Sequence, residues 1–400
     1  MGLNIKISKL QNLQDLNFAN KKVLLRCDIN VPFDSKQALL DNTKIINLAP
    51  TVRFLLKQKA KILLISHLGR PDGQYKDHLS LKNLIPYLEK YLTIKIKFLK
   101  HLSLNDNLQS INQLKNNEIA LLENLRFFKA EQDNDQEFGR LLSKLADVYI
   151  NDAFSCCHRR HASIDAVTQF MPSYGGLLLK NELKTITNIL NIYSKPMTLI
   201  IGGKKISTKI KTLVNLINKV DKIFIAGAMA NNFLKSLGYQ IGKSFYEIDN
   251  VNDATQMYVK NKDKIFLPND FVGINNGKIV IKNIDNISQD DCLFDIGMNS
   301  CRVLKEIIEN SKTIIWNGPV GFYEEPQFAT ASLYIANVIA CCTKHQGLSS
   351  IICGGDTVAI TKLSGLKDDF SYISTGGGAF LELIEKENLI GLNNLIKAKL

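Results

Sequence analysis

Basic and polar side chains follow four short apolar runs in the first half of the chain. Each run is rich in Val, Ile and Leu, and the residues after it include at least one arginine or histidine. The side chains are Arg26, Asp28, Asn30, His67, Arg70, Arg126, His158, Arg159, Arg160 and His161. The planar guanidinium group of arginine binds carboxylates and phosphates through two parallel hydrogen bonds. The pattern predicts a site for a small polyanionic acid, with Asp28 and Asn30 placed to contact a hydroxyl group on it.

Glycines follow apolar runs in the second half, in the segments IIGGKK, IAGAMA, WNGPVG, CGGDT and STGGGA. Where a glycine turn opens a helix, backbone N–H groups and the helix dipole bind phosphate. Several such turns predict a nucleotide site, with Lys205 and Lys209 at the start of a helix expected over 206–220. We expect Asp356 to reach a phosphate-bound Mg²⁺ and Glu324 to bind ribose hydroxyls.

Ten apolar runs supply the strands that position these residues, and continuous runs are typical of strands buried on both faces of a parallel sheet. They are residues 23–29, 61–68, 94–99, 118–124, 147–154, 198–203, 222–228, 313–318, 351–355 and 371–375. We expect the first strand to continue through Asn30, so that Arg26, Asp28 and Asn30 face one way. Apolar stripes between runs, such as Ile206, Ile210, Leu213, Val214 and Ile217, predict helices. The fold class is therefore α/β with two parallel sheets, and ligands are expected beyond the carboxyl ends of the strands.

The domain organisation follows from the grouping of the runs. We predict a first domain over 1–178, an interdomain helix over 179–195 that ends before Pro196, and a second domain over 196–387. A helical connector without glycine lets two domains move as rigid bodies.

Composition excludes several classes of protein. The net charge of +12 divides into +9 over residues 1–190 (27 Lys+Arg, 18 Asp+Glu) and +3 over 191–400 (23 against 20). This excess indicates either an anionic ligand in the first half or diffuse surface lysine. No run approaches the roughly 20 apolar residues of a membrane span, and the amino terminus is no secretory signal, so a cytoplasmic protein is expected. Eight cysteines without a C-x-x-C pair predict reduced, buried thiols.

One nucleotide-binding motif is imitated in the sequence and two others are missing. GYQIGKS (238–244) has three residues between its glycines where a P-loop has four, which predicts an ordinary turn. No G-x-G-x-x-G follows a strand, and the protein-kinase signature set is missing.

Eight segments, taken in order, resemble the pattern of the phosphoglycerate kinase family over residues of about 20 to 385. They are RCDINVP, SHLGRP, LLENLRFF, NDAF…HRRH, GGKK, WNGPVG, GGDT and STGGGA. The resemblance implies two Rossmann-like domains facing each other across a hinged cleft, with the tail at about 388–400 packed back on the first. The first domain would bind 3-phosphoglycerate or 1,3-bisphosphoglycerate and the second ADP or ATP with Mg²⁺. It also implies a monomer with no nucleic-acid or membrane partner.

The resemblance assigns roles to individual residues. Substrate binding falls to Asp28, Asn30, Lys44, His67, Leu68, Gly69, Arg70, Arg126 and Arg159, and catalysis to Lys205 and Lys44. Nucleotide binding falls to Gly203, Lys205, Lys209, Gly227, Asn317, Glu324, Gly354, Gly355, Asp356, Thr357, Gly376 and Gly377, with Asp356 on the metal through the nucleotide.

The chain departs from the family pattern at several positions. Lys44 stands where the family has arginine, Lys204 where it has alanine, Thr208 where it has aspartate and Met298 where it has proline. Further departures are the AGA before Met229, the SCC at 155–157 and the EKEN at 385–388. We therefore expect an enzyme that is slower than a typical member. The alternatives are a catalytically impaired binding or scaffold protein of this family and, from the pI near 9.1, a nucleic-acid-binding protein.

Overall fold

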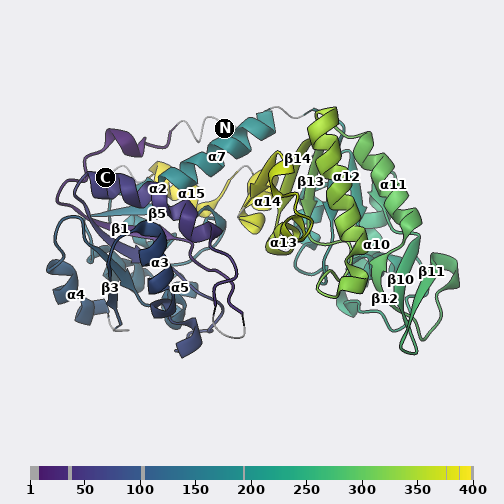
Figure 1. The fold of residues 1–400 in the computed structure, drawn as a ribbon, viewed down its shortest axis with the longest axis horizontal. Coiled ribbons are helices and arrows are strands. Elements are labelled where there is room, and N and C mark those ends of the chain that lie inside the picture. Colours follow the sequence, from purple (N-terminus) through teal and green to yellow (C-terminus); the bar gives the residue numbers. More distant parts are fainter. Residues whose placement is uncertain are drawn as a thin grey trace. The chain divides into compact units, whose positions relative to one another are not determined.

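The computed structural model describes residues 9–34, 38–100, 104–191, 194–374, 376–386 and 388–397 (Figure 1). Two compact units divide the chain, one of residues up to Asn188 together with those from Lys386 onward, and one of Ile189–Glu385. The first division falls within helix α7 (Leu177–Asn191). Among the helices of the described ranges, none combines the length and the apolar composition that crossing a membrane requires.

The first unit is built on a six-stranded parallel sheet in the order β3-β4-β2-β1-β5-β6. Its strands are β1 (Lys22–Cys27), β2 (Lys61–Ile65), β3 (Ile96–Leu99), β4 (Ile119–Leu122), β5 (Val148–Asp152) and β6 (Ser173–Gly175). Its helices, besides α7, are α2 (Thr43–Lys57), α3 (Ile85–Leu92), α4 (Leu104–Asn112), α5 (Lys129–Gln132), α6 (Gln136–Ser143) and α15 (Ile390–Lys397). The chain order reverses between β1 and β5, which makes their carboxyl ends the switch point of the sheet.

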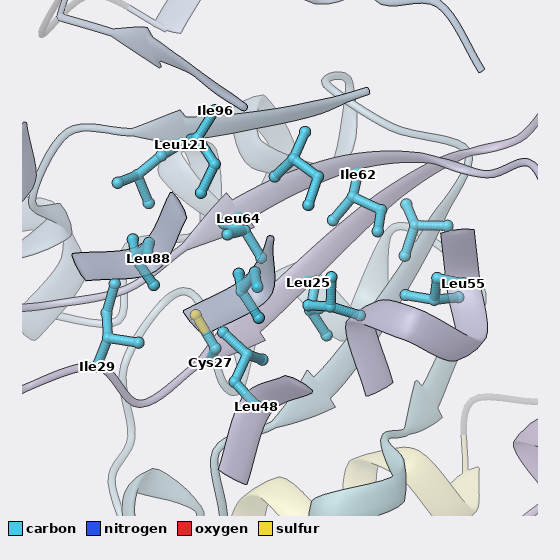
Figure 2. Close-up of a cluster of buried hydrophobic side chains, with 14 of the residues drawn as sticks. Leu25, Cys27, Ile29, Leu48, Leu55, Ile62, Leu64, Leu88, Ile96 and Leu121 are labelled. Atoms are coloured by element: carbon cyan, nitrogen blue, oxygen red, sulfur yellow. The ribbon is translucent and has the colours of Figure 1, made fainter. Parts of the chain in front are cut away.

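The core of this unit lies between one face of the sheet and two helices (Figure 2). Leu25, Ile62 and Leu64 from the strands pack with Leu48 of α2 and Leu88 of α3, and all five are buried. Leu24 and Leu63, which alternate with these residues along the strands, are buried as well, so the strands are covered on both faces, as the sequence predicted.

The second unit is built on another six-stranded parallel sheet, in the order β15-β14-β13-β7-β8-β9. Its strands are β7 (Met197–Ile201), β8 (Lys222–Ile225), β9 (Ile265–Phe266), β13 (Thr313–Asn317), β14 (Ser349–Cys353) and β15 (Tyr372–Ser374). The helices are α8 (Ile210–Leu216), α9 (Ala230–Ser236), α10 (Val251–Lys260), α11 (Met298–Glu309), α12 (Thr330–Gln346), α13 (Gly355–Leu363) and α14 (Gly377–Lys386). Each of the ten predicted runs overlaps a strand, β6 and β9 were not predicted, and the two parallel sheets confirm the α/β class.

A three-stranded antiparallel sheet in the second unit was not predicted. It pairs β11 (Lys278–Asn283), β10 (Asp270–Asn275) and β12 (Cys292–Ile296) in that order. Asn276 and Gly277 connect β10 to β11 with φ values of 46° and 77°. An Asn-Gly pair with both residues at positive φ is the strongest short hairpin signal, so this sheet was readable from the sequence.

Two predicted elements are shorter than expected. Strand β1 ends at Cys27 rather than continuing through Asn30, because the Asp28 carboxylate accepts a hydrogen bond from the Asn30 N–H at 3.0 Å and turns the chain. Helix α8 begins at Ile210 rather than at 206. The Ser207 N–H and hydroxyl both bond Glu247, at 2.8 and 2.7 Å, so these groups do not start a helix. Val214, predicted on the apolar stripe, is 51% exposed.

Helix α15, coloured yellow in Figure 1, lies among the purple and blue elements of the first unit. The Gly391 N–H donates to the Cys157 carbonyl at 2.9 Å, and the Asn394 amide donates to Asp165 at 2.8 Å. A Cβ on Gly391 would approach the Cys157 Cα to 3.1 Å, so glycine permits this close packing.

All eight cysteines are free, and six are buried, whereas Cys341 is exposed and Cys292 half-buried.

Candidate functional site

The loops after β2 and β4 are joined by Asn124, which is fully buried. Its Oδ1 accepts from the Leu68 N–H at 3.2 Å and the Arg126 N–H at 3.1 Å, and its Nδ2 donates to the Leu68 carbonyl at 2.8 Å. The Leu68 side chain is itself buried, so Leu68 contributes its backbone N–H and carbonyl to this arrangement. Asn124 was not among the predicted site residues, although it lies in the same ENLRF segment as Arg126.

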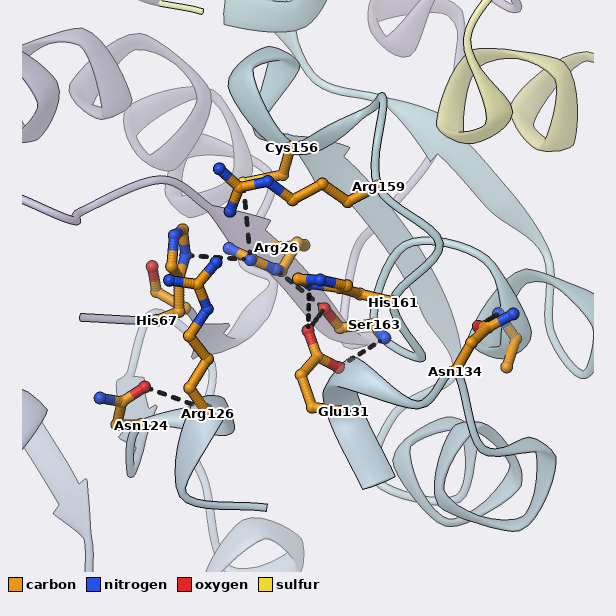
Figure 3. A network of polar contacts seen from close by, with 12 residues as sticks. Arg26, His67, Asn124, Arg126, Glu131, Asn134, Cys156, Arg159, His161 and Ser163 are labelled. Carbon is orange, nitrogen blue, oxygen red and sulfur yellow. Dashed lines mark hydrogen bonds and ion pairs between the residues drawn. The ribbon is translucent and has the colours of Figure 1, made fainter. Parts of the chain in front are cut away.

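Two arginines, Arg126 and Arg159, meet at this edge of the sheet, and each has one buried guanidinium nitrogen without a hydrogen-bond partner among the described residues (Figure 3). The Arg126 Nη1 donates to the Gly69 carbonyl at 2.5 Å. Within the described part of the chain, Arg126 Nε and Arg159 Nη1 are buried without any hydrogen-bond partner. Burial, with the nearby charge of Arg159 next, lowers the pKa of Arg126 to about 10. Buried N–H groups without partners and repelling cations together indicate that an anion belongs here.

Asp28 and Asn30 lie in the loop after β1 and are held by neighbouring residues. Lys44 Nζ is 2.7 Å from an Asp28 carboxylate oxygen, and the Ser155 hydroxyl bonds the same oxygen. The Asn30 side chain accepts from the Gly69 N–H at 2.9 Å. The Lys44 ammonium and the neighbouring groups hold the pKa of Asp28 below its ordinary value despite burial, so this carboxyl is ionised.

His67 and His161 are neutral at this edge. Burial, together with the positive charge of Arg26, lowers the pKa of His67 well below its ordinary value. Burial and then Arg159 lower the pKa of His161 to about 3. Arg70 is exposed and adds to the positive charge around Arg126. Arg26, predicted to face the ligand beside Asp28 and Asn30, is instead fully buried beneath these residues.

In the second unit the glycine turns after β7 and β13 touch backbone to backbone. The Gly202 N–H donates to the Asn317 carbonyl at 3.0 Å. A Cβ on Gly202 would lie 1.9 Å from the Pro319 oxygen, so no other residue fits there. Gly227, at φ 65°, approaches the Gly203 nitrogen in the same way. These contacts align turns that come from distant parts of the sequence.

Lys209 is bonded inside these turns. Its Nζ donates to the Gly202 carbonyl at 2.5 Å and to the Asn317 carbonyl at 3.1 Å. Burial lowers the pKa of Lys209 to about 8. Lys205, by contrast, is exposed, and its carbonyl accepts from the Thr208 hydroxyl at 2.9 Å. The two predicted phosphate-binding lysines therefore have different surroundings.

A cavity of about 300 Å³ opens beside the turns and is lined mainly by apolar side chains. Gly203, Gly227, Glu324 and Asp356, all predicted, are among its lining residues. The apolar wall was not predicted and is formed by Phe245, Phe271, Leu293, Phe294, Ile296, Val320 and Phe322. Its size and its apolar wall with a few polar groups are typical of a site for a flat organic ligand.

Other predicted residues hold the turns rather than line the cavity. The Thr357 hydroxyl accepts from the Gly318 N–H at 2.6 Å and donates to the Cys353 carbonyl at 2.9 Å. The Asn317 amide donates to the same carbonyl at 3.0 Å. A Cβ on Gly377 would lie 2.6 Å from the Gly354 nitrogen. Gly376 is buried beside this contact, and Gly355 is exposed at the start of α13.

One departure from the family pattern lies at each site, Lys44 beside Asp28 and Lys204 at the cavity. Lys204 lines the cavity with its Nζ 5.0 Å from the centroid of the Phe245 ring. Met298 begins α11 and is 47% exposed. GYQIGKS forms turns between α9 and α10, as predicted.

Across the described ranges, no three His, Cys, Asp or Glu side chains gather as a metal site. Asp356 is exposed at the cavity, and a single carboxylate there fits an Mg²⁺ held mainly by nucleotide phosphates.

Comparisons with known proteins agree with this arrangement over nearly the whole chain. The family model described as Phosphoglycerate kinase matches residues 13–387. A phosphoglycerate kinase from Wolbachia pipientis subsp. Culex pipiens (strain wPip) is 41% identical over 392 residues, covering 96% of this chain and 98% of that protein. One from Orientia tsutsugamushi (strain Ikeda) is 43% identical over 397 residues, with coverage of 97% and 98%.

Solved structures give the same result. The structure of phosphoglycerate kinase from Coxiella burnetii has 33% sequence identity and a TM-score of 0.79, covering 96% of this chain and 98% of that one. The crystal structure of phosphoglycerate kinase from Pyrococcus horikoshii OT3 has 26% identity and a TM-score of 0.83, with the same coverage. The fold with its two six-stranded parallel sheets thus matches these structures, and the chain belongs to the phosphoglycerate kinase family.

Proposed function

We propose that this chain transfers a phosphoryl group reversibly from 1,3-bisphosphoglycerate to ADP with Mg²⁺, giving 3-phosphoglycerate and ATP (EC 2.7.2.3). The observation that carries the proposal is a pair of buried arginine nitrogens, Arg126 Nε and Arg159 Nη1, which have no hydrogen-bond partner within the described residues. A phosphorylated three-carbon acid supplies two anionic groups and a hydroxyl group, which matches the cations and the Asp28 carboxylate.

The acid is held by the first unit in this proposal. Arg70, Arg126 and Arg159 bind its phosphate, and Lys44 and the neutral His67 bind its carboxylate end. Asp28, ionised beside Lys44, accepts a hydrogen bond from the hydroxyl group of the acid, and Asn30 and Gly69 position the adjoining loop. Leu68 contributes only its backbone.

The nucleotide is held by the second unit. Its base occupies the cavity among Phe245, Phe294 and Phe322, and Glu324 binds the ribose. Lys205 and Lys209, with the turns at Gly203, Gly227 and 354–357, bind the phosphates. Asp356 would hold Mg²⁺ together with phosphate oxygens, and the metal would neutralise phosphate charge. The proposal includes action as a monomer, since one chain supplies every group.

The chemistry requires no general base, because the attacking oxygen belongs to a carboxylate or a nucleotide phosphate that is already ionised. Catalysis consists of bringing the two reactants into line and neutralising the charge of the transferring group. Lys205 and Lys44 supply that positive charge from the nucleotide side and the acid side respectively. Neutral histidines suit this reaction, since no proton has to move.

The direct test is a coupled assay of ATP-dependent phosphorylation of 3-phosphoglycerate by the purified chain. The proposal expects turnover that requires both 3-phosphoglycerate and a divalent cation. No turnover, with ADP still bound in calorimetry, would favour the binding or scaffold alternative. No binding of either ligand, with tight salt-dependent binding to random DNA, would favour the nucleic-acid alternative.

Replacing Lys44 with arginine should raise turnover. Lysine retains the positive charge but lacks the planar guanidinium group that donates hydrogen bonds to two oxygens at once, and the Lys44 ammonium is paired with Asp28 at 2.7 Å. Because removing a whole donor of this kind costs about 10²–10³ in rate, restoring the fork should give a gain of about tenfold or less. The measurement is kcat in the coupled assay. Arg53→Lys, at an exposed position of the same helix, is the matched control and should change nothing; an unchanged kcat in Lys44→Arg would contradict the prediction.

ADP binding should weaken as the pH rises past 8. In the free protein the pKa of Lys209 is lowered to about 8 by burial, so its ammonium loses its proton above this pH and the phosphates lose a cation. One pH unit above the pKa about nine-tenths of the lysine is neutral, which predicts about tenfold weaker binding at pH 9 than at pH 7.5. Calorimetric titration with ADP across this range measures it. Lys209→Arg stays charged and should show a flat profile; equal slopes in both proteins would speak against Lys209 as the titrating group.

A further inference from the structure

Arg26 lies beneath the proposed acid site and makes hydrogen bonds in several directions, although it is fully buried (Figure 3). Its Nε donates to the Ser163 hydroxyl at 3.0 Å, and its Nη1 bonds the Cys27 carbonyl. Its Nη2 lies 3.2 Å from His67 Nδ1 and 3.7 Å from Cys156 Sγ. Every edge of the guanidinium group is thus occupied by protein atoms, so Arg26 is not available to a ligand.

Glu131 compensates the charge of Arg26 through Ser163. The Glu131 carboxylate is fully buried and accepts from the Ser163 hydroxyl at 2.7 Å and from the Ser163 N–H at 2.9 Å. Because the Arg26 Nε–H can only donate, the Ser163 oxygen accepts a hydrogen bond from Arg26, and the Ser163 O–H donates a hydrogen bond to Glu131. The direction of each hydrogen bond between Glu131 and Arg26 is therefore determined.

The same reasoning determines the proton on His67. A guanidinium group has no acceptor, so the nitrogen that meets Arg26 Nη2, His67 Nδ1, must carry a lone pair rather than a proton. His67 is also neutral, since burial and Arg26 lower its pKa well below the ordinary value. A neutral imidazole keeps one proton, and here it must be on Nε2. The two ring nitrogens point in divergent directions, so this proton points away from Arg26.

We propose that Glu131 and Ser163 are positioning residues which, through Arg26, fix His67 as the Nε2–H tautomer and so make it a permanent uncharged donor to an anionic oxygen of the substrate acid. This inference rests on the proposed function, because it assigns the recipient of the hydrogen bond. It adds to that function a reason why a histidine stands among arginines. A fourth cation beside Arg26, Arg126 and Arg159 would be repelled, whereas a neutral ring donates without that cost.

The decisive experiment is nitrogen NMR of the ¹⁵N-histidine-labelled full chain, since the protonated and unprotonated ring nitrogens of a neutral imidazole have well-separated shifts. The chain has six histidines, and the spectrum of His67→Gln identifies the signals of His67. The principal variant is Ser163→Ala, which removes the hydroxyl between Glu131 and Arg26. The matched control is Ser173→Ala, whose hydroxyl is equally buried but donates to the Met171 carbonyl at 2.9 Å, away from this network.

We expect the wild-type protein and Ser173→Ala to place the His67 proton on Nε2. Ser163→Ala should give a mixture of tautomers and bind 3-phosphoglycerate about tenfold more weakly, the effect of one misplaced hydrogen bond to a charged group. Glu131→Gln, which keeps the shape of the carboxylate and removes its charge, should act in the same direction.

Two outcomes would overturn the proposal. One is a His67 proton on Nδ1 in the wild-type protein. The other is an unchanged His67 spectrum in Ser163→Ala that is still folded. Failure of the proposed function is distinguishable from both, because a chain that does not bind 3-phosphoglycerate still reports the His67 tautomer in the absence of ligand.

Discussion

Lys205→Ala should lower kcat by about 10²–10⁵, because the lysine is proposed to neutralise the charge that passes between the two reactants. The residue is exposed directly after the turn at Gly203, and the bond from the Thr208 hydroxyl to its carbonyl, at 2.9 Å, fixes the backbone there. Binding energy gained only in the transition state is lost from kcat and not from ground-state affinity. ADP affinity should therefore change far less than turnover does.

The measurements are kcat in the coupled assay and the ADP dissociation constant by calorimetry. Lys211→Ala, at an exposed position of the neighbouring helix α8, is the control for loss of one lysine and should stay within about twofold of the wild-type protein. Retained turnover in Lys205→Ala would mean that the phosphoryl group is transferred elsewhere, and the assignment of the nucleotide turns would have to be withdrawn.

Arg126→Met should raise the KM for 3-phosphoglycerate and at the same time stabilise the free protein. The loss of a buried, charge-assisted contact to the substrate predicts a KM about 30- to 1,000-fold higher. In the free protein Arg126 is 7% exposed, its Nε has no partner among the described residues, and burial and the charge of Arg159 lower its pKa to about 10. Removing this repulsion and this unpaired donor should add about 1 kcal/mol to the free energy of unfolding.

Urea unfolding with and without 3-phosphoglycerate separates these two effects. The wild-type protein should be stabilised by the ligand, whereas Arg126→Met should start from a higher stability and gain little from it. Arg140→Met is the control, since Arg140 is exposed on α6 and paired with Glu137 at 2.6 Å. A less stable Arg126→Met protein with an unchanged KM would identify Arg126 as a purely structural residue.

The parallel sheets and the residues at their edges were readable from the sequence because both depend on local patterns. Continuous apolar runs located ten of the twelve strands of the two parallel sheets, all but the short β6 and β9, and residues that follow a strand end gather at one edge of a parallel sheet. His67, Arg126 and Arg159 were predicted in this way, whereas Asp28 and Asn30 were predicted from a strand that in fact ends at Cys27.

What could not be predicted depends on contacts between distant segments. Phe245, Phe294 and Phe322 resemble core residues in the sequence, and only the folded chain places them around one cavity. Phe245 and Phe322 are 39% and 42% exposed, and this exposure distinguishes them from core residues. The hydrogen bonds of Lys209 to backbone carbonyls and the burial of Arg26 could likewise not be predicted. The alternation of side chains along a strand shows which face a residue is on, but not how deeply it is buried.

The return of α15 to the first unit has a consequence for synthesis on the ribosome. All residues of the second unit have been made once the chain has passed Glu385, whereas the first unit still lacks the helix that packs beside Cys157 and Asp165. The unit that begins first is therefore the last to be completed. A nascent chain halted shortly before α15 would present a complete second unit next to an unfinished first one, the reverse of the usual order in which amino-terminal domains finish before the rest.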